Sequence, residues 1–519
     1  MRDVIGKMVA ALVLLLVLAS PAFAGGEQEG AAAEDVTVIK WFGQRGVPSP
    51  DAEVVGLLES EISQRLGYEV RFELYGAVQD HQELLQLNLA AQELPDVFLY
   101  FGVDTDFTRQ AVARFDIQEM FDNMPRMTSF LLELMADLGL DEEETWAKYQ
   151  DEDGLMFGTP RIWDLGWIPS GQMWREDILD ELGYEVPSTI AEAEEVFAAY
   201  KEAYPDRYVL GASGRSPTWQ AFDIVFNAFG IVNGGHGIQD GTVRQYFAYP
   251  EWRDALEVIA RWYEAGYIDP EFVNHDNNEK FRRFAQGQYL VTEWINRNNW
   301  DFNRDAPNIG NLVDNVPGAV AIPARHLAAS EGRKPIQRVW NPFLGQIVAF
   351  GNHMTNDMEH MRKVMQVGDL ISQDREIKYL AAYGVEGTHY TLEEGEEAPT
   401  PTNLVRGLSQ ADAIEQYGYG FYWDGVFSTY TPLPSNVQAA VEEHVLSPDG
   451  IYHQNQIDYW LGGSIISGPI RDESGEDVGA LLAADSSLDP WVMSTRIILG
   501  QEPIEYYDEW LENWYANGG

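Results

Sequence analysis

Three apolar strands alternate with two helices in the first part of the chain, and this alternation constrains the fold more than any other feature. The strands are predicted at residues 36–42, 70–74 and 97–101, where apolar side chains run together or alternate with polar ones. The segments between them have apolar residues at helical spacing, and the first segment ends at Gly67, a residue typical of helix ends. Strands connected by helices form a parallel open sheet with helices on its faces, so we expect an α/β protein.

Open parallel sheets bind ligands beyond the carboxyl ends of their strands. That rule selects Gln44 and Arg45 after the first strand, Tyr75 after the second, and Tyr100, Phe101 and Asp104 at the end of the third. A dinucleotide-binding fold would need a glycine fingerprint after the first strand. The fingerprint is missing, so this class is excluded.

A loop rich in helix-breaking residues follows Gly158 and Pro160. It carries Arg161 together with Trp163 and Trp167, and a cation beside aromatic side chains in a loop is typical of a binding surface. The alternative is a buried connector whose tryptophans belong to the core, because tryptophan is highly buried on average.

Three segments resemble the family 1 extracellular solute-binding proteins of sugar ABC importers, and in particular their large oligosaccharide-binding branch. The first, WREDILDELGYEVPST, spans residues 174–189, and a capping box of Thr189 and Glu192 opens the next helix. The second spans residues 263–294 and includes YEAGYIDPEF and FRRFAQGQYLVTEW. The third, YGVEGTHY, spans residues 383–390.

The resemblance implies a two-lobed periplasmic binding protein type II fold, with interleaved lobes, a hinge, and a saccharide in the cleft between the lobes. We expect residues 36–160 and 297–351 to form lobe 1, the N-terminal α/β lobe. Lobe 2, the C-terminal and mostly helical α/β lobe, is expected at residues 161–296 and 352–519. In related maltose-type receptors a tryptophan after the strand of the second segment stacks on the sugar, and Trp294 holds the matching position here.

Further aromatic residues are candidates for the same site. Trp219 and Trp340 lie in loop or crossover segments, and Tyr422 and Trp423 lie in an aromatic patch whose glycines let the backbone approach a ligand. A pyranose has apolar faces and a ring of hydroxyls. Aromatic rings cover such faces, while Arg, Asn, Gln and Asp side chains bind the hydroxyls through planar hydrogen bonds. The sequence therefore predicts a saccharide site.

The N-terminus has the features of a secretory signal peptide. Residues 1–24 contain basic residues, an apolar run at residues 8–19, and small residues at the cleavage positions, so we expect cleavage after Ala24. Residues 25–35 are expected to be a flexible leader. The chain has no cysteine, so neither a disulfide nor a lipid anchor on an N-terminal cysteine is expected. The sequence predicts a periplasmic or secreted protein that is not lipidated.

The charge balance is strongly acidic. Asp and Glu number 83 and Lys and Arg number 34, which gives a formal net charge of −49. Such a surface repels nucleic acid and anionic membranes, so both are excluded as partners, and it favours a neutral ligand over a polyanionic one. An acidic excess of this size also fits surroundings rich in salt, where screening reduces self-repulsion.

The sequence carries no motif for catalysis, a metal or a cofactor. A nucleophile elbow, a zinc-protease helix and a phosphate loop are all missing from it. Asp301, Asn303 and Asp305 begin like a calcium loop but lack its glycine and distal glutamate. Some large-branch relatives have a calcium loop that would match residues 203–207, where the ligands are missing here. We therefore expect no catalytic residue, no metal and no cofactor.

The sequence thus predicts a monomeric extracytoplasmic receptor that binds an oligosaccharide and delivers it to the permease subunits of an ABC importer in the inner membrane. The alternative is a secreted glycoside hydrolase acting on a polysaccharide, because a catalytic pair of carboxylates has no sequence motif. A surface adhesion or scaffold protein is a third class, which the single-copy α/β architecture disfavours.

Overall fold

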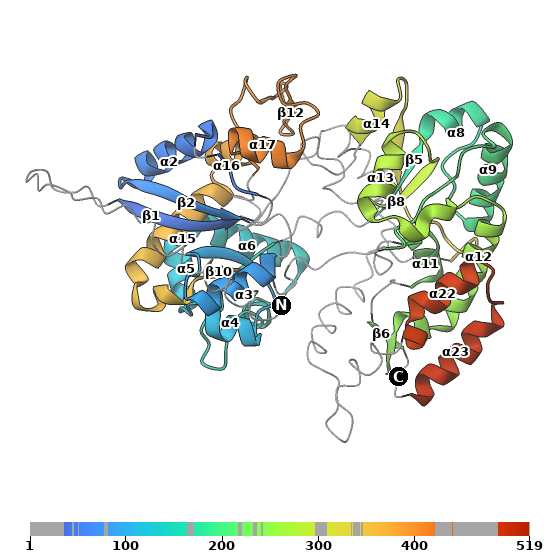
Figure 1. The fold of residues 1–519 in the computed structure, drawn as a ribbon, viewed down its shortest axis with the longest axis horizontal. Coiled ribbons are helices and arrows are strands. Elements are labelled where there is room, and N and C mark those ends of the chain that lie inside the picture. The colour runs from blue at the N-terminus through green and yellow to red at the C-terminus, as the bar shows by residue number, and fades with distance from the viewer. Residues whose placement is uncertain are drawn as a thin grey trace, which may run out of the picture. The chain divides into compact units, whose positions relative to one another are not determined.

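The described chain contains two main sheets, and helices pack with each sheet around a hydrophobic core of its own (Figure 1). The computed structural model describes residues 36–43, 46–49, 51–76, 81–162, 171–215, 221–231, 236–239, 242–295, 309–333, 335, 343, 346–420, 439 and 486–517. No helix within these ranges is both long enough and apolar enough to cross a membrane.

The first sheet has the strand order β2-β1-β3-β10-β4. Its strands and the helices that accompany them in the first core are β1 (Thr37–Gly43), α2 (Glu53–Leu66), β2 (Val70–Gly76), α3 (His81–Ala91), β3 (Val97–Phe101), α4 (Asp106–Ala111), α5 (Ile117–Asn123), α6 (Pro125–Leu138), α7 (Glu142–Ala147), β4 (Thr159–Pro160), β10 (Gln346–Phe350), α15 (Met358–Gln373), α16 (Arg375–Tyr383) and α17 (Gln410–Tyr417). β1 pairs in parallel with both β2 and β3, which confirms the predicted parallel sheet.

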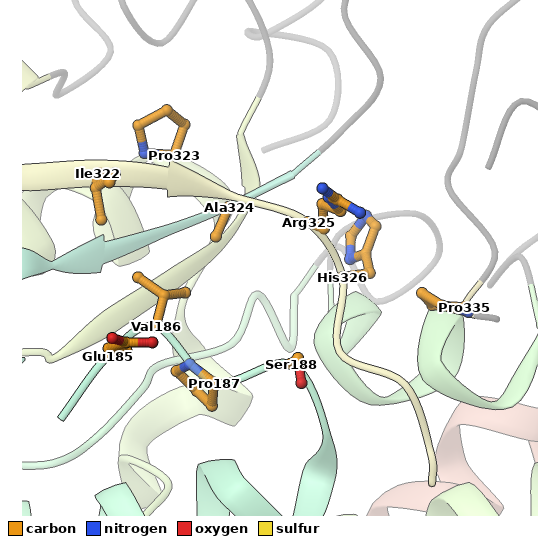
Figure 2. Close-up of a pocket in the computed structure, with 10 residues that line it drawn as sticks. All are labelled: Glu185, Val186, Pro187, Ser188, Ile322, Pro323, Ala324, Arg325, His326 and Pro335. Carbon is orange, nitrogen blue, oxygen red and sulfur yellow. The ribbon is translucent and has the colours of Figure 1, made fainter. Parts of the chain in front are cut away.

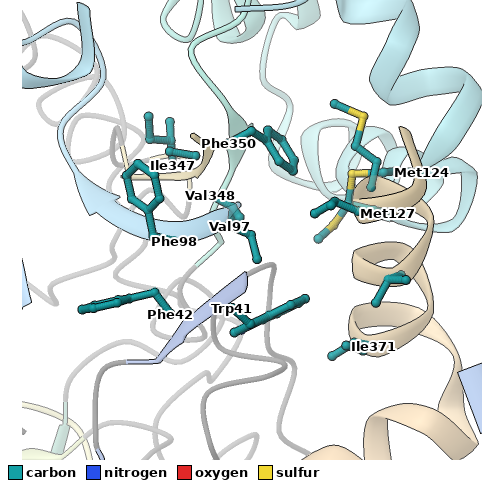
Figure 3. Close-up of a cluster of buried hydrophobic side chains, with 14 of the residues drawn as sticks. Trp41, Phe42, Val97, Phe98, Met124, Met127, Ile347, Val348, Phe350 and Ile371 are labelled. Atoms are coloured by element: carbon teal, nitrogen blue, oxygen red, sulfur yellow. The ribbon is translucent and has the colours of Figure 1, made fainter. Parts of the chain in front are cut away.

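Local sequence explains where the first elements begin and end. α2 buries Val54, Leu58 and Ile62 on one face and ends at Gly67, whose φ of 77° is left-handed and suits glycine. Successive residues of β1 face opposite sides of the sheet, so Trp41 and Phe42 enter separate packing layers. In Figure 3 Trp41 lies on the side of α6 and α15, and Phe42 points away from them. Both faces of the sheet are therefore buried at Trp41 and Phe42.

The second sheet is antiparallel, with the order β8-β5-β9. The second core contains β5 (Gly171–Arg175), α8 (Glu176–Leu182), α9 (Ile190–Ala203), α11 (Asp223–Phe226), α12 (Pro250–Glu264), β8 (Val291–Ile295), β9 (Ala321–Ala324), α22 (Pro490–Ile498) and α23 (Glu505–Ala516). α13 (Asn277–Ala285) contacts β8 beside this core. Thr189 and Glu192 form the predicted capping box of α9. Aromatic pairs fill this core; Phe226 stacks on Trp252 with ring centroids 4.0 Å apart. α14 (Ile309–Asn315), the hairpin β6 (His236–Gln239) with β7 (Thr242–Gln245), and β11 (Tyr390–Thr391) with β12 (Thr400–Pro401) complete the list.

Two segments pack in a different core from the one expected. Residues 352–519 were expected together in lobe 2, but α15 and α16 place Met361, Val364 and Ile377 in the first core. β9 falls within residues 297–351, expected in lobe 1, yet all its residues pair with β5 of the second sheet. In both cases backbone pairing and side-chain packing over long sequence distances decide the grouping. The boundaries of the lobes as domains stay a prediction.

Candidate binding site

One edge of the first sheet collects the ends of several strands. β1, β2 and β3 run in parallel, so their carboxyl ends share this edge. β10 is antiparallel to β3, and its first residue, Gln346, pairs with Phe101 at the same edge. Pro160 of β4 pairs with Ile347, so Arg161 follows at this edge as well. We call it the first edge, formed by Tyr75, Tyr100, Phe101, Arg161 and Gln346.

Arg161 and Gln346 form a buried polar pair at the first edge. The guanidinium Nη1 of Arg161 donates a hydrogen bond of 2.8 Å to the side-chain oxygen of Gln346, and its backbone N–H donates to the Gln346 carbonyl at 3.0 Å. Arg161 is 6% exposed, so its side chain is held inside the edge and does not extend into solvent. Guanidinium and amide groups have planar arrays of donors and acceptors, which suit the hydroxyls of a sugar.

The aromatic residues of the first edge differ in exposure. Tyr100 is buried and stacks on Phe107, with ring centroids 4.5 Å apart. Tyr75 and Phe101 are 37% and 38% exposed, and the Tyr75 hydroxyl donates to Glu73. The two exposed rings are therefore the ones available to cover an apolar ligand face.

Asp104 follows the first edge and is bound by an arginine. Both of its carboxylate oxygens accept hydrogen bonds from Arg109, at 2.7 and 3.0 Å. These bonds hold the pKa of Asp104 below its usual value. Its side chain is about half exposed, so a ligand could still reach it.

The second sheet has a comparable edge. Gln172 of β5 pairs with Glu293 of β8 on one side and with Ala324 of β9 on the other. We call this the second edge; it comprises Gln172, Glu293, Trp294, Ala324, Arg325 and His326. Trp294 lies in β8 directly after Glu293, and its side chain lies outside the described residues.

Glu293 and Lys280 are buried charged residues at the second edge. The Glu293 carboxylate accepts hydrogen bonds from the backbone N–H groups of Phe222 and Ile224. Lys280 Nζ donates to the Glu293 backbone carbonyl at 3.1 Å. Burial raises the pKa of Glu293 and lowers that of Lys280 to about 8. Neither residue is among those predicted from the sequence; the available signal was a charged residue inside an apolar strand, VTEWI.

A cavity of about 510 Å³ adjoins the second edge (Figure 2). It lies between β9 and residues 185–188, and Arg325 and His326 line it directly after the strand. His326 is buried and its ring lies 3.1 Å from the Asn227 side-chain amide. The cavity thus combines an apolar wall, Val186 and Ile322, with polar groups at the strand end.

Most of the predicted site residues cannot be placed. The side chain of Trp294 and the whole of Gln44, Arg45, Trp163, Trp219, Trp340, Tyr422 and Trp423 lie outside the described residues. Their part in the site stays a prediction. The structure does bring Tyr75, Tyr100 and Phe101, which the strand-end rule selects, to one sheet edge, and Arg161, predicted from its loop, follows β4 at the same edge.

The third family-like segment, YGVEGTHY, forms a tight turn after α16, and its Tyr383 and Tyr390 pack with Tyr379 in a small separate cluster. Gly384 has a φ of 84°, and a side chain there would collide with the His389 ring. His389 Nδ1 accepts a hydrogen bond from the Val385 N–H, and the ring packs against Tyr417 and Tyr419. These contacts explain the presence of Gly384 and His389 by the shape of the turn.

The loop after α9 holds a lysine ammonium group among its carbonyl oxygens. Lys201 Nζ donates to the carbonyls of Pro205 and Arg207, at 2.9 and 2.7 Å. Across the described part of the chain, no group of three or more His, Asp or Glu side chains is arranged to hold a metal ion.

No family model matches the chain. The similar proteins described next are all named as binding proteins. The polygalacturonan/rhamnogalacturonan-binding protein YtcQ of Bacillus subtilis (strain 168) is 22% identical over 382 residues, which cover 71% of this chain and 68% of YtcQ. The ABC-transporter substrate-binding protein FusA of S. pneumoniae, solved as an EF-hand mutant with fructo-nystose, has a TM-score of 0.59, 16% identity, and coverage of 93% of this chain and 96% of that one. The alginate-binding protein AlgQ2, solved without calcium ion, has a TM-score of 0.56, 18% identity, and coverage of 94% and 96%.

The predicted α/β fold of two-lobed solute-binding proteins is confirmed by these structural neighbours. The likeness extends over more than nine-tenths of this chain, so it includes both sheets and both cores. The resemblance to ABC-importer receptors that the sequence segments carry is confirmed as well. All three relatives are named as binding proteins.

Proposed function

We propose that this chain is an extracytoplasmic solute receptor that binds an oligosaccharide and delivers it to the permease of an ABC importer. The observation that carries the proposal is the first edge, where two exposed aromatic rings accompany a buried Arg161–Gln346 pair. This edge belongs to a fold that is shared with a substrate-binding protein of an ABC transporter.

The residue types of both edges suit saccharide chemistry. Tyr75 and Phe101 are exposed enough to cover the apolar face of a pyranose, and the half-exposed Asp104 provides a planar hydrogen-bonding group beside the buried Arg161. At the second edge Trp294 is the proposed stacking residue. We propose that the sugar binds between the two lobes, in contact with both edges.

We propose a neutral oligosaccharide as the ligand. The net charge of −49 repels polyanions, and Arg109 beside the first edge is already paired with Asp104. YtcQ is named for binding polygalacturonan, so uronic-acid oligosaccharides are the rival ligand class. The two classes differ in salt dependence, because binding of a charged ligand weakens or strengthens with ionic strength far more than binding of a neutral one.

The proposed partners and location follow from the same reading. The receptor would act as a monomer outside the cytoplasm, after cleavage behind Ala24 and without a lipid anchor, and would dock on permease subunits in the inner membrane. FusA is named as a substrate-binding protein of an ABC transporter, which supports a permease as the partner.

Isothermal calorimetry against neutral and uronic-acid oligosaccharides tests the proposal. We expect one or more neutral oligosaccharides to bind with 1:1 stoichiometry and to be recovered intact by chromatography. Binding confined to uronic-acid oligosaccharides would overturn the neutral ligand and leave the receptor assignment standing. Steady release of shorter sugars, at a rate proportional to protein concentration, would instead assign the chain to the glycoside hydrolases.

A further inference from the structure

A strained turn precedes α11 at the second edge. Phe222 has φ 60° and ψ 27°, in the left-handed region that bulky residues rarely adopt. Its N–H and that of Ile224 both point to one carboxylate, that of Glu293, at 2.7 and 2.9 Å. A conformation of this kind persists only where the surroundings hold it, and such sites cluster at binding positions.

The contacts of Phe222 come from several distant segments. The centre of its ring lies 5.3 Å from that of Phe272 and 6.3 Å from that of Trp491 in α22. Its backbone is tied to β8 through Glu293. The turn is therefore held by the second sheet on one side and by the core on the other.

Lys280 adds a third element to this arrangement. It comes from α13, is 0% exposed, and donates to the backbone carbonyl of Glu293. That carbonyl belongs to the peptide unit that leads into Trp294. Asp223, also buried, lies close enough to influence the charge of Lys280. Three ionisable side chains from β8, α13 and α11 are therefore buried near one another at the second edge.

A gain in folding stability does not explain why charged side chains are buried at this position. Removing two ions from water costs more than their attraction usually returns, and apolar replacements of similar volume are often as stable or more stable. Buried hydrogen bonds to charged groups do, however, restrict the geometry, because each bond leaves few alternatives for its partner. The bonds in this group involve the side chain and the backbone carbonyl of Glu293, so they restrict the backbone at the end of β8.

We propose that Glu293 and Lys280 are positioning residues that fix the end of β8, and with it Trp294, for oligosaccharide binding. The proposal rests on the proposed function, because it assigns these residues to the same site. Glu293 acts through the Phe222 turn, and Lys280 acts through the Glu293 carbonyl. Neither side chain needs to touch the sugar.

Fluorine NMR of protein labelled with 5-fluorotryptophan tests the proposal in the absence of sugar. The Trp294 resonance is identified by its loss in Trp294→Phe. In Glu293→Gln an amide replaces one carboxylate oxygen, so one of the two backbone N–H groups loses its acceptor. We expect the Trp294 resonance to shift or broaden and the sugar affinity to fall at least tenfold. Lys280→Met, which keeps the carboxylate, should shift the same resonance and provides the test if Glu293→Gln does not fold.

Asp369→Asn is the matched control. Asp369 is equally buried, but it lies in the first core, where it accepts a hydrogen bond from the Met127 N–H and pairs with Arg126. This variant should leave the Trp294 resonance and the affinity unchanged. An unmoved Trp294 resonance in both Glu293→Gln and Lys280→Met overturns the positioning role, as does a moved resonance with unchanged affinity. If the wild-type protein binds no oligosaccharide, the proposed function fails on its own, while the resonance still reports whether the pair positions Trp294.

Discussion

The imidazole Nε2 of His360 lies 3.0 Å from one carboxylate oxygen of Asp96, whose other oxygen lies 2.7 Å from His353 Nε2. Asp96 stands at the start of β3, and its carboxylate also accepts the Lys40 N–H. Burial alone would raise the pKa of Asp96, but these hydrogen bonds outweigh it and hold the pKa well below its usual range. The hydrogen bond to Asp96 raises the pKa of His360 in turn. Through these two hydrogen bonds, His353 and His360, which follow β10, connect to β3 at the centre of the first sheet.

The hydrogen bond between His360 and Asp96 should make the free energy of unfolding depend on pH. The folded pKa of His360 lies above its unfolded value, so the stabilisation is complete below about pH 6.5 and is lost as pH rises through the folded pKa. We expect the free energy of unfolding to fall by about 1 kcal/mol more in the wild type than in His360→Gln between pH 6 and pH 9, since a hydrogen bond to a charged group contributes on that order and the site is partly exposed. Urea unfolding at both pH values measures the difference. Parallel pH profiles would contradict this role.

The ammonium group of Lys201 should stabilise the loop after α9 without a metal ion. Its ammonium group binds two backbone carbonyls, so Lys201→Met leaves them without a donor and should lower the free energy of unfolding by about 1–2 kcal/mol. Lys363→Met is the control, because Lys363 lies 3.7 Å from the exposed Glu359 and 5.4 Å from the centre of the Tyr68 ring, and contacts of both kinds at exposed sites contribute roughly 0–1 kcal/mol. Differential scanning calorimetry should show no effect of a chelator on the wild type. A melting temperature several degrees lower in the chelator would place a metal in the protein after all.

Salt should stabilise the protein. The net charge of −49 makes the folded state repel itself, and the screening length falls from about 10 Å at 0.1 M salt to about 3 Å at 1 M. We expect a higher urea midpoint in 1 M sodium chloride than in dilute buffer. An unchanged or lower midpoint would show that self-repulsion is unimportant for this fold.

The mature protein should begin at Gly25 and carry no acyl chain. The basic, apolar and small-residue regions of residues 1–24 motivate this expectation. Intact-mass measurement on protein from the extracytoplasmic fraction gives the N-terminus directly. Retention of Met1, or the added mass of a lipid, would contradict it.

Local patterns predict local structure well in this chain. The strands expected at residues 36–42, 70–74 and 97–101 agree with β1, β2 and β3 to within two residues, because their ends are marked by apolar alternation and by residues such as Gly67. The capping box of Thr189 shows the same clarity, since its bonds form within four residues. Signals of this kind need no knowledge of the rest of the fold.

Packing between distant segments is what the sequence leaves open. The apolar stripe of α15 predicts that the helix is buried, but the choice of core depends on contacts with α5 and α6 over two hundred residues away. Tyr100 lies in a strand buried on both faces, so alternation could not indicate whether its ring packs inside or meets a ligand. Glu293 and Lys280 are ordinary surface residues by type, and only the fold places them together.

Trp294→Ala should weaken oligosaccharide binding and leave the fold largely intact. A tryptophan that stacks on a sugar and is desolvated by it should contribute about 2 kcal/mol or more, so the affinity should fall roughly 30-fold. Trp262→Ala is the matched control, because Trp262 is fully buried with its ring 4.9 Å from Phe197 and its loss should cost about 3–5 kcal/mol of folding free energy. Calorimetric titration and urea unfolding of both variants separate the two effects. An unchanged affinity with a large loss of stability in Trp294→Ala would make Trp294 a core residue and remove the second edge from the proposed site.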